Sequence, residues 1–85
     1  MGRLLDNVTA DPTDTWCAHI GGKLLECRRG AQVTFRQLSD GTGLSAAYLC
    51  DLENGKRNPS SWTLLVLSEF FVVRCGWWFE DYTGE

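Results

Sequence analysis

The most informative segment of this 85-residue chain is VTFRQLSDGTGLSAAYLCDLENGKRNP, residues 33–59. Thr34 is followed three residues later by Gln37, which is the spacing of a capping box at a helix N-terminus. Gly41 and Gly43 predict the end of that helix, because glycine adopts a positive φ without strain. The first part of the segment is therefore predicted to be a short helix that ends in a tight turn.

The second part of the segment predicts another short helix. Ser45 is a suitable N-cap, and Asn54-Gly55 suits the C-terminus because both residues tolerate the left-handed conformation. The inward-facing residues that this arrangement needs are Leu38, Leu49 and Leu52. Two short helices joined by a glycine-containing turn are typical of a helix-turn-helix.

The segment resembles the DNA-binding domains of Cro and the phage repressors, the lambda-repressor-like (xenobiotic-response-element-like) helix-turn-helix family. The resemblance extends from about Leu24 to Phe71, and its most specific part is the GKRNPS sequence at 55–60. The other residues that carry it are Thr34, Leu38, Gly43, Leu44, Ser45, Tyr48, Leu49, Leu52, Glu53, Thr63 and Leu64. The resemblance implies an all-α, compact five-helix domain that binds double-stranded DNA without a cofactor.

The resemblance also implies which residues contact DNA, with helix 45–54 entering the major groove. The expected DNA-binding residues are Thr34, Arg36, Ser45, Ala46, Ala47, Tyr48, Asp51, Asn54, Lys56 and Arg57. The alanine methyls can pack against thymine methyls, and Asp51 can accept a hydrogen bond from cytosine N4. Thr34 and Asn54 match phosphate-holding positions, and Lys56 and Arg57 would add charge contacts.

Two departures from the family pattern change the expected base readout. Phe35 stands where phage repressors often carry a glutamine that supports base contacts. Ala46-Ala47 replaces longer polar residues, so that Arg36, Tyr48 or sequence-dependent DNA shape would carry more of the specificity.

The resemblance further implies a structural ion pair between Arg28 and Glu53, the residue that ends the second short helix. The alternative is that Arg28 is an ordinary solvated surface cation. A partly buried pair of this kind would fix geometry more than it would add stability.

Composition and charge are compatible with this interpretation. The net charge of −3 disfavours strong non-specific binding to DNA, but residues 23–58 hold six basic residues against four acidic ones. Cys17, Cys27, Cys50 and Cys75 lie ten, 23 and 25 residues apart, which is not the spacing of a zinc site. We therefore expect free thiols and no metal. With one histidine, no carboxylate pair and no phosphate-binding loop, we expect no enzymatic activity.

The organisation along the chain is predicted to be simple. Residues 1–14 are polar and acidic, with Asp11-Pro12 disfavouring a helix, and are expected to form a mobile arm. Residues 15–71 are expected to form the helix-turn-helix domain, beginning with a helix over 15–29. Gly21-Gly22 within that helix indicates either close backbone packing or a helix that begins later. The 72–85 segment would be an aromatic tail.

The fourth predicted helix, Ser60–Phe71, is apolar on two faces. Leu64, Leu67 and Phe71 form the core face, whereas Trp62, Val66 and Phe70 form a second stripe that must also be covered. The aromatic tail either folds back over this stripe or joins it in contacting a second subunit. We favour a homodimer, with an expected interface of Trp62, Val66, Phe70, Trp77 and Trp78.

The sequence as a whole predicts a sequence-specific transcriptional regulator, a repressor of bacterial or phage genes that acts in the cytoplasm. No apolar run is long enough for a membrane span or a secretory signal. The alternative function is a protein-interaction module, such as an antitoxin or adaptor, that keeps the fold without specific DNA readout. The regulator requires Lys56, Arg57 and the 45–54 face to be accessible together; the adaptor requires the Trp62–Trp78 surface to be exposed on a monomer.

Overall fold

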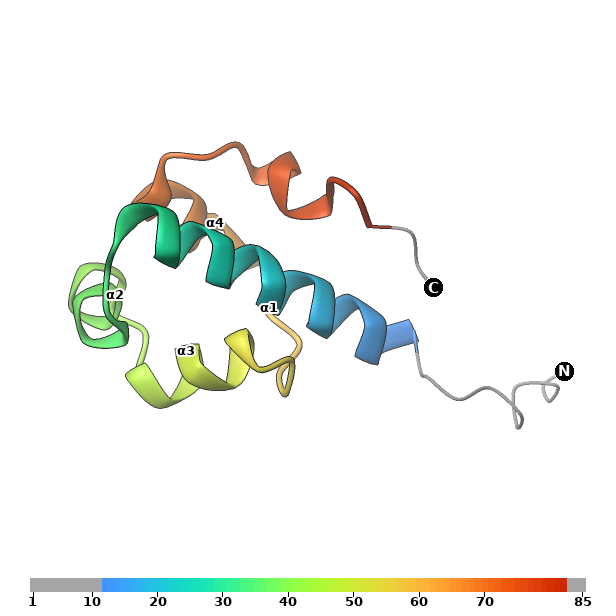
Figure 1. Ribbon diagram of the computed structural model, residues 1–85, viewed down its shortest axis with the longest axis horizontal. Helices are drawn as coiled ribbons and strands as arrows, with labels where there is room; N and C mark the ends of the chain where they lie inside the picture. Colours follow the sequence, from blue (N-terminus) through green and yellow to red (C-terminus); the bar gives the residue numbers. More distant parts are fainter. Residues whose placement is uncertain (1–11, 83–85) are drawn as a thin grey trace, which may run out of the picture.

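Helix α1 lies at the centre of the computed structural model, with η2 on one side of it and α3 on the other (Figure 1). The structure describes residues 12–82. Their elements are α1 (Pro12–Ala31), α2 (Phe35–Thr42), α3 (Ala46–Glu53), α4 (Ser61–Phe71) and the short 3₁₀-helix η2 (Cys75–Phe79). Residues 12–82 contain no strand, and the predicted all-α class is confirmed. No helix in this range has the length and apolar character of a membrane span.

Helix α1 begins earlier than the sequence predicted. Pro12–Asp14 were expected to belong to a mobile arm, but they form the first turn of α1. A proline fits there because the first N–H groups of a helix have no intrahelical partner. The rest of the expected arm, residues 1–11, lies outside the described residues. At its other end α1 continues through Gly30 to Ala31, and Gln32 takes the positive φ of 57° that ends it.

A close contact between α1 and α3 explains one of the two glycines inside α1. A Cβ on Gly21 would lie 2.6 Å from the carbonyl oxygen of Glu53 and 2.8 Å from that of Leu52. No other residue would allow the C-terminal end of α3 to approach α1 so closely. Close backbone packing, one of the two predicted explanations for Gly21-Gly22, is therefore correct for Gly21, whereas Gly22 faces open space.

The predicted helix caps are present. The Thr34 hydroxyl accepts a hydrogen bond from the Gln37 N–H, and the Gln37 side chain accepts one from the Thr34 N–H. The Ser60 hydroxyl likewise accepts from the Thr63 N–H at the start of α4. Gly43 has the expected positive φ, at 81°, whereas Gly41 lies within α2. Gly41 has a packing role instead, because a Cβ there would collide with the Phe70 ring of α4.

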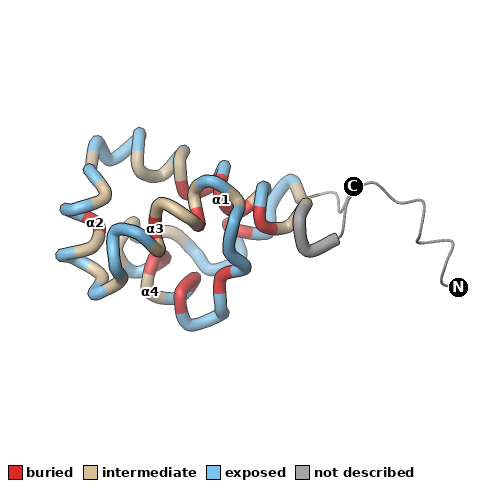
Figure 2. The backbone as a smooth tube through the Cα atoms, turned by 90° about the horizontal axis from the view of Figure 1, so that it is seen from below, coloured by how far each residue is buried: buried red, intermediate tan, exposed pale blue. Residues whose placement is uncertain are grey.

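Every helix contributes to one hydrophobic core, and buried positions alternate with exposed ones along the chain (Figure 2). The core consists of Ile20, Leu24, Leu38, Leu49, Leu52, Leu64, Leu67 and Trp78. It includes the three leucines that were predicted to face inward from α2 and α3.

The C-terminal segment folds back onto its own chain and completes this core. Trp78 is fully buried, and its indole Nε1 donates a 2.7 Å hydrogen bond to the Ser68 hydroxyl on α4. His19 Nε2 on α1 donates a 2.8 Å hydrogen bond to the Trp78 carbonyl oxygen. Lys23 Nζ lies 4.3 Å from the centre of a Trp77 ring.

The predicted position of Trp78 in a dimer interface is therefore wrong, because a side chain with no exposed surface cannot meet a partner. The sequence interpretation also assumed that a folded-back tail would cover the Trp62, Val66 and Phe70 stripe. The tail instead packs against α1 and the core side of α4, while Phe70 packs against α2 and Trp62 remains 67% exposed.

Candidate nucleic-acid interface

The turn between α2 and α3 is held by side-chain hydrogen bonds as well as by glycine. The Thr42 hydroxyl donates to the Leu38 carbonyl oxygen at 2.7 Å and accepts from the Leu44 N–H at 3.2 Å. The Ser45 hydroxyl then accepts from the Tyr48 N–H at 3.0 Å and caps α3, as predicted. The N-terminal end of α3 is thus fixed relative to α2. The role of Thr42 was missed, although a threonine between two glycines is a recognisable turn signal.

Helix α3 presents one face to the core and one to solvent. Leu49 and Leu52 are buried, whereas Ser45, Ala46 and Ala47 are exposed. Tyr48, Cys50 and Asp51 are half-buried, and Asn54 is exposed. The predicted outward residues therefore do lie on the accessible side of the helix.

The chain leaves α3 through a turn that places two basic residues beside the end of the helix. Gly55 has a φ of 74°, and its N–H donates to the Leu52 carbonyl oxygen at 3.1 Å. The Lys56 N–H donates to the Asp51 carbonyl oxygen at 2.9 Å, which completes a Schellman motif. Asn54 has a φ of −88°, so only Gly55 uses the left-handed conformation that was expected of both residues.

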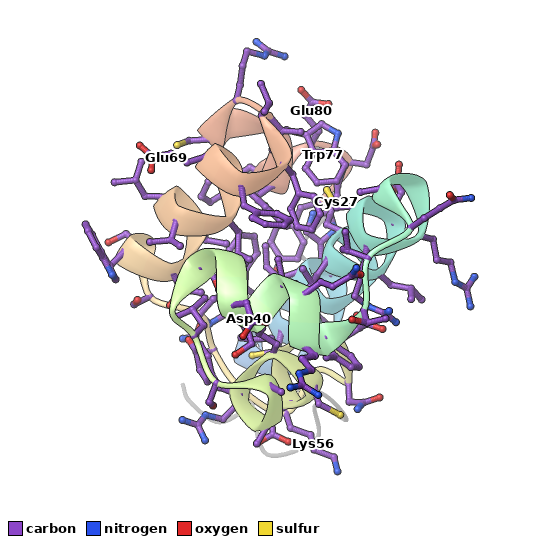
Figure 3. The ribbon with its side chains drawn as sticks, turned by 90° about the vertical axis from the view of Figure 1, so that its left-hand side faces the viewer. Cys27, Asp40, Lys56, Glu69, Trp77 and Glu80 are labelled. Carbon is purple, nitrogen blue, oxygen red and sulfur yellow. The ribbon has the colours of Figure 1, made fainter. Side chains whose placement is uncertain are left out.

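The two basic residues of this turn are accessible. Lys56 and Arg57 are both exposed, and Lys56 lies on the opposite side of the molecule from Glu69 and Glu80 (Figure 3). Glu69 and Glu80 therefore do not weaken the attraction of this turn for a phosphate backbone, whereas Asp51 lies 3.9 Å from Arg57. The accessibility required of a DNA-binding regulator is therefore present, despite the net negative charge.

The ion pair between Arg28 and Glu53 is formed. Arg28 Nε and one Nη donate to the two Glu53 carboxylate oxygens at 2.8 and 2.9 Å, and the other Nη donates to the Val33 carbonyl oxygen at 3.1 Å. The guanidinium carbon also lies 4.3 Å from the centre of the Phe35 ring. Hydrogen bonding to Glu53 raises the pKa of Arg28 above its usual value. Arg28 is thus a fixed structural residue and not a solvated cation.

A second charged pair lies on the outer side of α3. Arg57 Nη1 is 3.9 Å from Asp51 Oδ2, and the Arg57 guanidinium carbon lies 5.2 Å from the centre of the Tyr48 ring. The Tyr48 hydroxyl in turn shares a 3.0 Å hydrogen bond with the Thr63 hydroxyl of α4. Arg57 is therefore folded back against α3. Sequence reasoning placed all three residues in the site but did not connect them.

Three other predicted DNA contacts lie at the ends of α2 and α3. Thr34 and Arg36 are exposed in the first turn of α2. The Thr34 N–H donates to Gln37, and both the N–H and the side-chain amide of Asn54 donate to the Cys50 carbonyl oxygen. The backbone donors of Thr34 and Asn54 thus already have partners within the chain, which leaves Arg36 as the accessible donor-rich side chain of this set.

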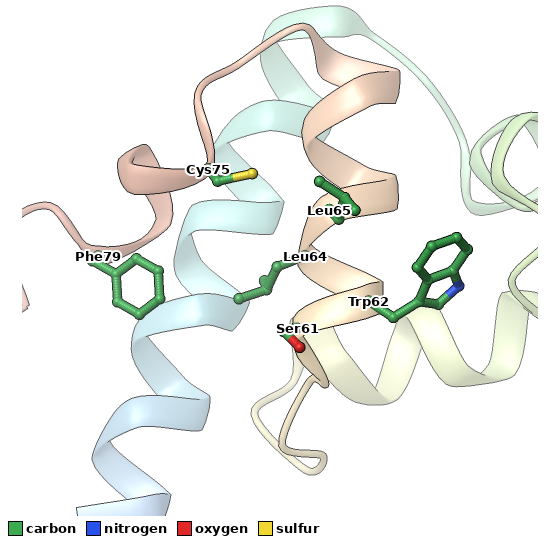
Figure 4. Close-up of a pocket in the computed structure, with 6 residues that line it drawn as sticks. All are labelled: Ser61, Trp62, Leu64, Leu65, Cys75 and Phe79. Atoms are coloured by element: carbon green, nitrogen blue, oxygen red, sulfur yellow. The ribbon is translucent and has the colours of Figure 1, made fainter.

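A separate apolar surface lies on α4 and η2. Its exposed members are Trp62 at 67%, Leu65 at 43%, Val72 at 87% and Phe79 at 55%. A hollow of about 380 Å³ lies within it, lined by Ser61, Trp62, Leu64, Leu65, Cys75 and Phe79 (Figure 4). We call Trp62, Leu65, Val72 and Phe79 the α4–η2 surface.

Sequence reasoning found only part of this surface. Trp62 was predicted to belong to an interface and is exposed. Val66, Phe70 and Trp77 were also predicted, but they are half-buried. Leu65 and Val72 are exposed and were not predicted. Leu65 lies three residues after Trp62 and shares its helix face, so the helical spacing could have indicated it.

The chemistry of the described residues and the comparisons with known proteins add no further assignment. Cys27, Cys50 and Cys75 are free thiols, and no cluster of three or more metal-ligating side chains occurs in the described range. Comparison with protein-family models, curated proteins and solved structures found no match. The functional interpretation therefore depends on the residues and geometry of the chain itself.

Proposed function

We propose that this chain is a sequence-specific, double-stranded DNA-binding regulator of the lambda-repressor-like helix-turn-helix class. The observation that carries the proposal is the accessible face of α3 with Lys56 and Arg57 placed beside its C-terminal end. In this interpretation α2 and α3 form the helix-turn-helix and η2 takes the place of a fifth helix. Such a regulator acts in the cytoplasm of a bacterium or a phage-infected cell, and repression is the activity that the resemblance implies.

The dimensions and surface of α3 support this proposal. An α-helix with its side chains is about 10–12 Å in diameter, and the major groove of B-DNA is about 12 Å wide, so α3 can enter it. The small residues Ala46 and Ala47 allow the N-terminal end of α3 to approach base edges closely. The exposed side chains of Arg36 on α2 and Lys56 after α3 would serve as phosphate contacts.

Selection of bound fragments from random duplex DNA, followed by fluorescence anisotropy over a series of salt concentrations, tests the proposal. We expect a defined sequence motif and an affinity that falls steeply as salt rises. Lys56→Ala should weaken binding to all sequences and reduce the salt slope by about 1. The matched control is Arg74→Ala, which removes one charge from the opposite side of α1. Recovery of no motif, with equal weak binding to all duplexes, would contradict the proposal.

A second candidate function is supported by the exposed α4–η2 surface. A protein-interaction module would use this surface for a partner protein and would not need the basic turn after α3. Exposed apolar patches of this kind mark interaction sites in many proteins. The two functions are separated by the variants above, since Lys56→Ala would leave protein partnering unchanged.

The regulator and the exposed apolar surface are compatible if the protein is a homodimer. We propose that two copies pair through the α4–η2 surface, whose η2 part lies on the other side of α1 from α3 (Figure 1). A single small domain contacts few base pairs, and dimers commonly bind half-sites about 34–36 Å apart. This surface shares only Trp62 with the interface expected from sequence. It omits Val66, Phe70, Trp77 and Trp78 and gains Leu65, Val72 and Phe79.

A further inference from the structure

Arg57 contacts α3 with its guanidinium, while 55% of its side chain remains exposed to solvent. Its guanidinium lies between the Tyr48 ring and the Asp51 carboxylate, with the 5.2 and 3.9 Å separations given above. Tyr48 and Asp51 are one helical turn apart on α3, so that Arg57 contacts both side chains, and Tyr48 also packs against the core. The positive charge of Arg57 is therefore placed along the middle of α3, where base edges would lie if α3 entered the groove.

Asp51 presents a problem that this arrangement solves. A carboxylate on a helix that approaches DNA is repelled by the phosphates, and it loses solvation in the groove. Pairing with Arg57 neutralises that charge, and the pair strengthens as water is excluded. A direct hydrogen bond from cytosine N4 to Asp51, as expected from sequence, would have to compete with this pairing.

We propose that Arg57 reads a guanine in the major groove and that Asp51 is the residue that positions it. This inference depends on the proposed DNA-binding function and deepens it by naming the base and the residue that recognises it. Asp51 faces one nitrogen of the guanidinium, and the remaining N–H groups can donate to guanine O6 and N7. The Tyr48 ring, whose hydroxyl is hydrogen-bonded to Thr63, lies with its centre 5.2 Å from the guanidinium carbon.

The physical advantage is preorganisation. A free arginine side chain loses considerable conformational entropy when it is fixed against a base, and an arginine already held by two neighbours loses less. A lysine cannot replace it, because an ammonium group lacks the planar fork that matches the two guanine acceptors.

The test uses the full chain and the duplex obtained by selection, in which each guanine is replaced in turn by 7-deazaguanine, which lacks the N7 acceptor. At one position this replacement should lower the affinity of the unmodified protein for the duplex by roughly fivefold or more. The same replacement should have little effect on Arg57→Ala and on Arg57→Lys. Asp51→Ala should lose most of the sensitivity at that same guanine, whereas Asp51→Glu should retain it.

The double variant Asp51→Ala with Arg57→Ala should bind no more weakly than Arg57→Ala, because the two residues act as one unit. Lys56→Ala is the matched control, and it should keep the full sensitivity to 7-deazaguanine.

Three results would overturn the inference. If Arg57→Ala lowers the affinity for all DNA sequences equally and reduces the salt slope by about 1, Arg57 contacts a phosphate. If Asp51→Ala relaxes preference at a different base pair from Arg57→Ala, Asp51 reads a base itself. If selection yields no motif at all, the proposed function fails together with this inference, whereas the first two results overturn the inference alone.

Discussion

Glu53, the last residue of α3, accepts hydrogen bonds from two nitrogens of the Arg28 guanidinium on α1. Nε lies 2.8 Å from one carboxylate oxygen and Nη2 lies 2.9 Å from the other. The side chains are 22% and 11% exposed, and the guanidinium also contacts Val33 and Phe35 at the start of α2. Three helices therefore meet at one ion pair. The pair therefore connects the C-terminal end of α3 to α1 and to the start of α2.

The ion pair should contribute measurably to stability. In a double-mutant cycle, Arg28→Ala and Glu53→Ala should show a coupling of about 2 kcal/mol in urea unfolding, because each single variant leaves a poorly solvated charge. The control is the Arg74–Glu80 pair, whose side chains are 85% and 46% exposed and which should give less than about 1 kcal/mol. Equal coupling in the two cycles would show that Arg28 and Glu53 act only as surface charges.

Trp78 should be essential to the fold even though it lies near the C-terminus. Trp78→Ala should lower the free energy of unfolding by about 3–5 kcal/mol, since it empties a fully buried position. Ser68→Ala should cost about 1–3 kcal/mol by removing the acceptor of the indole N–H. Trp62→Ala is the control, because Trp62 is mostly exposed. If Trp78→Ala unfolds at the same urea concentration as Trp62→Ala, the tail does not complete the core.

Val72 has an unfavourable backbone conformation. Its φ of 57° and ψ of 50° are left-handed, which is rare for a β-branched residue, and it ends α4 in that state. Val72→Gly should raise the free energy of unfolding by about 1 kcal/mol. The relief of backbone strain in the folded state should exceed the stabilisation of the unfolded chain by the greater conformational entropy of glycine. Val72→Ala is the matched control: it removes the same exposed methyls but keeps Cβ, so the gain should be smaller.

The α4–η2 surface should control oligomeric state. Trp62→Gln combined with Leu65→Gln should give a monomer with unchanged helical content and weaker binding to a palindromic site, because large exposed apolar side chains leave the interface. Sedimentation at tens of micromolar measures this, with the exposed α1 residue Arg29→Gln as the control. A single species near 9.5 kDa for the unmodified protein, with no heavier form on DNA, would rule out the dimer.

Cys27 should make stability depend on alkaline pH. Burial, followed by the negative charge of Glu26, raises its pKa from 9.0 to about 11, while Lys23 acts in the opposite direction. Between these two values the unfolded chain releases the thiol proton and the folded chain keeps it. Stability should therefore fall as pH rises from 9 towards 11. Urea unfolding at both ends of this range should show a smaller fall for Cys27→Ser, but an unchanged one for the exposed-thiol variant Cys75→Ser.

Local features of the site were predictable from sequence because each depends on residues a few positions apart. Thr34 with Gln37, Ser45 and Ser60 are caps whose partners lie three residues away, and Gly43 and Gly55 have the positive φ that local chain reversal requires. The expected arrangement of two short helices also identified Leu38, Leu49 and Leu52 as inward-facing, and all three are buried. The Arg28–Glu53 pair, 25 residues apart, was found only through the resemblance to a family.

The remaining features depend on which surfaces meet in space, and no local pattern specifies that. An aromatic run predicts burial without saying where, and Trp78 found a partner in Ser68, ten residues away, while Trp62 did not enter the core. Gly21 is needed because the end of α3 lies against it, and Gly41 because Phe70 does. Sequence alone thus determined the helices, their caps and the turn; packing between distant segments determined the filled core, the exposed apolar surface and the position of Arg57 on α3.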